Sequence, residues 1–187
     1  MKKKIISVVV LLMLCCLRGT EATASDTVLV NVQDTLPVPK GIRNMMFYVQ
    51  RDPNANTVVY ELNLLEQGIP DEKDPIHPFW IRYADGGERK ELNYIQRKFA
   101  YGLNSKKLGK DSYELKFVCY SKLPLYLRKG TNGKFHVYAT INDKQAILNR
   151  IFVRIEGGTF WVPNVLYFEL KGTDAVTGKV VSERFKP

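Results

Sequence analysis

The sequence predicts an all-β domain, either an antiparallel sandwich or a barrel, with a β-meander in the C-terminal half and one short α-helix. Short segments with alternating apolar side chains recur along the chain. Turn-forming pairs such as Asn132-Gly133 and Gly157-Gly158 separate them, and one stretch has helical periodicity. The 187 residues, 45% hydrophobic and 25% charged, suffice for one well-packed domain and exclude a disordered or multi-span membrane protein.

The N-terminus has the pattern of a secretory signal peptide. Three lysines, Lys2 to Lys4, precede the apolar run Ile5 to Leu17, and the small residues of Ala22-Thr23-Ala24 follow. The apolar run is shorter than the about 20 residues of a transmembrane helix. We therefore expect residues 1–24 to be removed, and the mature protein to be periplasmic or extracellular, without a transmembrane helix.

A lipid anchor is the alternative fate of this segment, since Cys15 and Cys16 end the apolar run. A lipoprotein signal normally carries a small residue before the modified cysteine, whereas Leu14 precedes Cys15. Removal of the segment leaves Cys119 as the single cysteine, so we expect no internal disulfide. Cys119 continues the alternate row of Phe117, which predicts a small hydrophobic residue of the core.

A leader or edge strand and then a single β-rich domain are expected after the signal peptide, over residues 25–43 and 44–187. The proline-rich stretch 66–78 is incompatible with a helix or a central strand. The expected strands are Met45–Arg51, Thr57–Leu64, Phe79–Ala84, Tyr113–Tyr120, Leu123–Lys129, Phe135–Ile141, Gln145–Ile155, Thr159–Val162, Val165–Lys171 and Lys179–Phe185.

The helix is predicted over Glu88–Tyr101. Leu92, Ile95 and Phe99 recur every three or four residues, while mostly polar residues lie between them. We expect these three side chains to pack onto the sheet, and Gly102 to end the helix.

Four segments of the chain resemble a known family of exported bacterial domains, domain of unknown function 4833. They are Asn44–Pro53, His77–Gly86, Glu91–Gly102 and Tyr167–Asp174. The likeness extends from about Asn44 to Phe185. It implies export in a Gram-negative bacterium and a single compact domain, and it assigns no catalytic residue to this chain.

The sequence provides no catalytic residue, metal site or cofactor motif that we would assign. It has two histidines, His77 and His136, and neither a Gly-x-Ser-x-Gly motif nor a phosphate-binding loop with its lysine. Glu61, Glu156 and Glu169 lie on or beside expected strands, so a pair of carboxylates could serve an envelope polysaccharide or cell-wall hydrolase. That enzyme is the first alternative function.

Basic residues far outnumber acidic ones between Arg82 and Lys134. On a shared face they would attract an anionic glycan, a lipid headgroup or an envelope protein, although they could equally form an ordinary solvated surface. Export argues against nucleic acid as the partner. Aromatic rings with polar neighbours suit contact with sugars. The candidate ligand-binding residues are therefore Trp80, Arg82, Arg97, Lys98 and Trp161.

These features predict an exported, non-enzymatic binding or envelope-associated domain with an anionic or glycan ligand. The second alternative is a structural subunit of an envelope assembly, which would expose a larger apolar patch than a monomer usually does.

Overall fold

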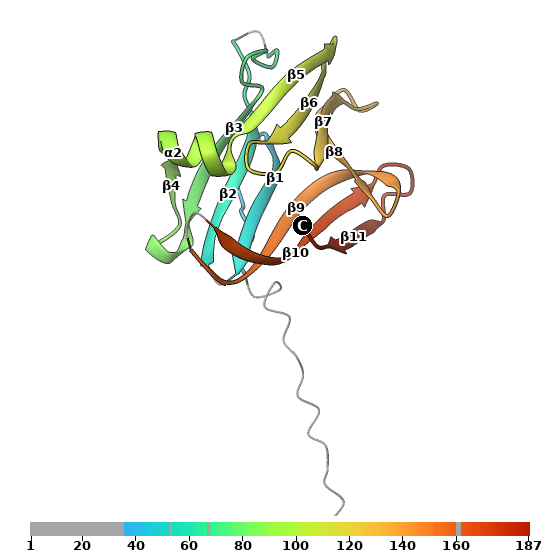
Figure 1. Cartoon of the computed structure of the whole chain (residues 1–187). Helices are drawn as coiled ribbons and strands as arrows, with labels where there is room; N and C mark the ends of the chain where they lie inside the picture. Colours follow the sequence, from blue (N-terminus) through green and yellow to red (C-terminus); the bar gives the residue numbers. More distant parts are fainter. Residues whose placement is uncertain (1–35, 53, 67, 160–161) are drawn as a thin grey trace, which may run out of the picture. The chain divides into compact units, whose positions relative to one another are not determined.

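One curled β-sheet of eleven strands dominates the protein and forms a half-barrel (Figure 1). The computed structural model describes residues 36–187 except 53, 67, 160 and 161. The prediction of an all-β fold with one short helix is confirmed. The predicted signal peptide, most of the predicted leader and Trp161 lie outside the described residues.

The helical elements are the 3₁₀ turn η1 (Tyr83–Asp85), the helix α2 (Tyr94–Gln96) and the π-helical turn η2 (Arg97–Tyr101). The strands are β1 (Met45–Asp52), β2 (Asn54–Leu62), β3 (Ile76–Arg82), β4 (Glu88–Glu91), β5 (Leu103–Gly109), β6 (Ser112–Phe117), β7 (Pro124–Lys129), β8 (Phe135–Ile141), β9 (Lys144–Gly158), β10 (Pro163–Asp174) and β11 (Val180–Phe185).

The strand order is β4-β3-β2-β1-β9-β8-β7-β6-β5, with β10 on β9 and β11 on β10. From β5 to β11 each strand pairs antiparallel with the next one, so the predicted C-terminal meander is confirmed. It begins earlier than expected, because residues 103–109 form β5. The sheet is mixed, since β1 runs parallel to β9 with Tyr48 opposite Arg150.

Strand β9 joins the two halves of the sheet. Its first residues, Lys144–Ile147, pair with β8, and Arg150–Arg154 pair with β1. Strand β10 follows the other edge of β9 from Ala146 to Gly158, with register shifts that include the step between Lys171 and Gly172. Such irregularities bend a sheet and increase its twist, so they contribute to the curl of this sheet.

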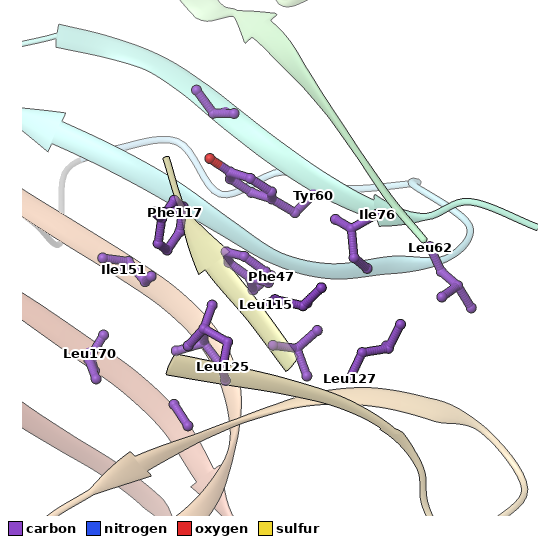
Figure 2. Close-up of a cluster of buried hydrophobic side chains, with 14 of the residues drawn as sticks. Phe47, Tyr60, Leu62, Ile76, Leu115, Phe117, Leu125, Leu127, Ile151 and Leu170 are labelled. Carbon is purple, nitrogen blue, oxygen red and sulfur yellow. The ribbon is translucent and has the colours of Figure 1, made fainter. Parts of the chain in front are cut away.

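The main core fills the concave face of the curled sheet (Figure 2). The rings of Phe47 and Tyr60 stack at 4.4 Å, and the ring of Phe117 meets both edge-on at 6.3 and 5.8 Å. Leu115 from β6 and Leu127 from β7 are fully buried beside them. Burial of each large side chain contributes roughly 1.5–3 kcal/mol, so this cluster holds the first strands against the meander.

A smaller cluster lies on the opposite face of β1, β2 and β3. It contains Tyr48, Val59, Phe79 and Ile81. The side chain of Gln50 on this face donates a hydrogen bond to the carbonyl of Pro37 at 2.8 Å. The described part of the predicted leader, residues 36–43, therefore runs as coil against this face.

The helix is shorter than predicted and begins later. Residues Glu88–Glu91 form strand β4, which pairs with β3. Asn93 caps α2: its side chain accepts a hydrogen bond from the Gln96 backbone at 2.8 Å, and the Gln96 side chain accepts one from the Asn93 backbone at 3.1 Å. The pairing of β4 with β3 overrides the helical periodicity before this cap.

Of the three apolar side chains predicted to pack onto the sheet from the helix, only Leu92 is buried, and it precedes the helix. Leu92 is 7% exposed, but Ile95 is 47% and Phe99 56% exposed. The predicted strand Thr159–Val162 lies partly outside the described residues, and neither of its two ends is in a strand.

We predict that Gly102→Ala destabilises the protein. A Cβ at position 102 would lie 2.0 Å from the carbonyl oxygen of Arg97, so η2 must shift, and such overpacking lowers the free energy of unfolding by about 1–3 kcal/mol. Gly109→Ala is the control, because no atom lies within 4 Å of the corresponding Cβ. Equal melting temperatures for the two variants would contradict the prediction.

Candidate functional site

An open cavity of about 490 Å³ lies on the concave face of the half-barrel, next to α2 and η2. Its volume is within the range of about 300–1,000 Å³ that is typical of small-molecule sites. Its walls come from β1 to β3, from α2 and η2, from the end of β6 with the segment that follows it, and from β9 with β10, and Pro187 also lines it. Most of the lining side chains are aliphatic or aromatic.

The strand walls follow from the alternation of side chains in a β-strand. Val49 and Arg51 point to the cavity from β1, and Ile151, Val153 and Ile155 form the corresponding row on β9. The cavity continues the core, since Tyr60 and Phe117 belong both to its lining and to the buried ring cluster. The packed core thus forms the floor of the cavity.

The helical wall is fastened to the sheet by two hydrogen bonds. The indole Nε1 of Trp80 donates to Oε1 of Gln96 at 3.4 Å, and the hydroxyl of Tyr60 donates to the carbonyl of Tyr101 at 2.9 Å. The Trp80 and Tyr101 rings meet edge-on at 5.0 Å. The same Gln96 side chain completes the helix cap, so capping and the position of this wall are coupled.

The outer part of the wall is apolar and exposed. Ile95 and Phe99 both line the cavity while large parts of their side chains face solvent. Exposed apolar side chains at the wall of an apolar hollow are typical of an interaction site.

Two phenols in the lining are held in the neutral form. Burial raises the pKa of Tyr60 well above its usual value, and burial also raises the pKa of Tyr101, with a smaller opposing effect of Arg51. These hydroxyls therefore act as hydrogen-bonding groups in the ordinary pH range.

The expectation that Cys119 belongs to the core is wrong. Strand β6 ends at Phe117, so the alternate row does not continue, and the exposed Cys119 lines the cavity. Neighbouring groups still keep water away from the sulfur, and this desolvation raises the pKa of the Cys119 thiol.

The predicted ligand-binding residues do not converge on one site. Trp80 lines the cavity and is only 8% exposed, while Arg82 pairs with Asp85 at 2.6 Å. The ammonium of Lys98 donates to the hydroxyl of Tyr94 at 2.9 Å.

Arg97 belongs to a polar network on the face of β3 opposite Trp80. Its guanidinium lies 3.2 Å from Oδ2 of Asp74, 3.4 Å from Nδ1 of His77 and 4.0 Å from Oε2 of Glu91. His77 and Glu91 are themselves 2.7 Å apart. These contacts tie η2 to β3, β4 and the loop before β3. Arg97 therefore holds the helical turn in position.

The sequence reasoning missed most of the cavity, including Arg51, Tyr101, Val153 and Phe99 as lining residues. The alternating apolar residues of β9 can be recognised in the sequence, but whether they line a cavity depends on the curl of the sheet.

Within the described ranges no three His, Cys, Asp or Glu side chains gather as a metal site would require, and no helix there has the length and apolar character to span a bilayer.

A family model matches residues 47–184, which is more than half of the chain and reaches from β1 to β11; its description is a domain of unknown function, DUF4833. No curated protein and no solved structure gives a significant match. The chain therefore belongs to the DUF4833 family, as its resemblance over Asn44 to Phe185 predicted.

Proposed function

We propose that this chain is an exported binding domain that holds a small, largely apolar molecule in the half-barrel cavity. The observation that carries the proposal is the apolar cavity of about 490 Å³ with exposed Ile95 and Phe99 in its wall. Export is supported by the basic residues, apolar run and small residues of positions 1–24.

The physical driving force for such binding is the removal of apolar surface from water. Each Å² of apolar surface that leaves water contributes about 25 cal/mol, and a preformed wall reduces the cost of ordering the site on binding. Here β1, β2 and β9 provide a rigid wall, because their side chains continue into the packed core. Only the helical wall has to adapt to the ligand.

A charged or sugar-binding face has weaker support. Arg82 and Arg97 already pair with acidic side chains, and Trp80 offers little ring surface for stacking. The hydrolase alternative needs two carboxyl groups that face a cleft, but the described lining residues include no Asp or Glu. In an envelope subunit, a partner protein would instead cover Ile95 and Phe99. If that partner is a second copy of this chain, the oligomeric state in solution would show a dimer.

The first test is titration with N-phenylnaphthylamine, a neutral apolar dye whose fluorescence rises in apolar sites. We expect saturable binding to the protein. Cys119→Trp, which fills the cavity from its rim, should weaken binding. We expect the dissociation constant to rise about tenfold or more, which corresponds to about 1.4 kcal/mol.

Cys119→Ser is the matched control and should bind the dye like the unchanged protein. Melting temperatures of both variants establish that they are folded. A dye signal that does not saturate, or equal affinity for Cys119→Trp and Cys119→Ser, would refute the cavity as the binding site.

A second test uses the thiol as a reporter of occupancy. We expect bound N-phenylnaphthylamine to slow alkylation of Cys119 by iodoacetamide, measured by mass spectrometry of the peptide that contains it. Since the thiol pKa is raised in the folded protein, less thiolate is present at a given pH. The pH midpoint of the reaction should therefore lie above that of the same chain in denaturant, and a lower midpoint would contradict this.

A further inference from the structure

Arg51 is the one charged side chain among the described residues that line the cavity. It is half-buried on β1, opposite Val153 of β9. Its guanidinium carbon lies 5.9 Å from the centre of the Trp80 ring and 6.0 Å from that of Tyr101. A cation thus lies beside a pair of edge-on aromatic rings, in a hollow whose other lining side chains are mostly apolar.

No carboxylate among the described residues pairs with Arg51. Its neighbours on the sheet differ in this respect: Asp52, next to it on β1, pairs with Arg154, and Arg150 pairs with Glu169 at 3.1 Å. Those two arginines alternate along β9 with the residues that line the cavity, and each has an acidic partner, whereas Arg51 contacts the two rings at the cavity.

A cation in an apolar cavity has lost part of its hydration, and the faces of aromatic rings replace that loss only in part. An anionic group of a ligand would compensate the charge. The planar guanidinium can donate two parallel hydrogen bonds to a carboxylate, which makes this pairing both strong and directional.

We infer that the ligand of this cavity is a single amphipathic anion, with an apolar body in the cavity and one anionic head, such as a carboxylate, on Arg51. This inference rests on the proposed function and specifies its ligand class. Arg51 would decide between charged and neutral ligands of the same shape, while the apolar walls would bind both.

Two dyes with the same ring system separate the two contributions. Anilinonaphthalene sulfonate carries one negative charge, and N-phenylnaphthylamine has the same rings without the sulfonate. We expect the full chain to bind the sulfonate dye more tightly. Arg51→Met keeps most of the side-chain length. It should lower the affinity for the sulfonate dye about tenfold or more and leave the affinity for the neutral dye within about twofold of that of the unchanged protein.

Lys98→Met is the matched control, because this cation lies on η2, is exposed and is not in the cavity lining. It should bind both dyes like the unchanged protein. Arg51→Lys should keep part of the preference for the anion, because it retains the charge but not the planar donor pair. Displacement of the neutral dye by dodecanoate should exceed displacement by dodecanol.

The outcomes distinguish the two proposals. If Arg51→Met binds the sulfonate dye as tightly as the unchanged protein while the neutral dye still binds, the inference about Arg51 fails and the apolar cavity stands. If neither dye binds, the proposed function fails as well. Binding to phosphatidylglycerol vesicles without any binding of dodecanoate would also overturn the inference, since the anion would then be recognised only as part of a membrane.

Discussion

The architecture depends on the pairing of β9 along both of its edges. β10 follows one edge, while β8 and then β1 occupy the other. Each buried backbone donor and acceptor of a strand needs a partner, and this arrangement provides one on both sides for most of a fifteen-residue strand. It also places the parallel strand β1 beside the meander, so the rings of Phe47, Tyr60 and Phe117 can meet in one core.

The cavity is a consequence of the incomplete closure of this sheet. In a small closed barrel the inward side chains fill the interior. Here the inward row of Ile151, Val153 and Ile155 extends beyond the packed rings, and the short helical segment provides the remaining wall. The two kinds of wall differ in physical character, because the strands are fixed by ladder hydrogen bonds whereas α2 and η2 together span only residues 94–101.

So short a helical segment is not stable by itself, and its position depends on tertiary contacts. Gln96 joins the cap to the indole of Trp80, and Arg97 reaches Asp74 and the His77–Glu91 pair on the other face of β3. Local openings in proteins begin where few buried contacts hold a segment. The helical wall is therefore the part of the site best able to adapt to a ligand, while Arg51 is fixed on β1.

The sequence by itself determined the all-β class, the single helical segment and the antiparallel meander, because alternation and turn residues act over a few neighbouring positions. It did not determine the parallel contact of β1 with β9, the strand at residues 88–91 or the exposure of Ile95 and Phe99. Among the candidate site residues, it identified Trp80 and missed Arg51. The curl of the sheet decides which face of each strand becomes the cavity, and that curl arises from pairings between residues about a hundred positions apart, such as Tyr48 and Arg150, which no local pattern encodes.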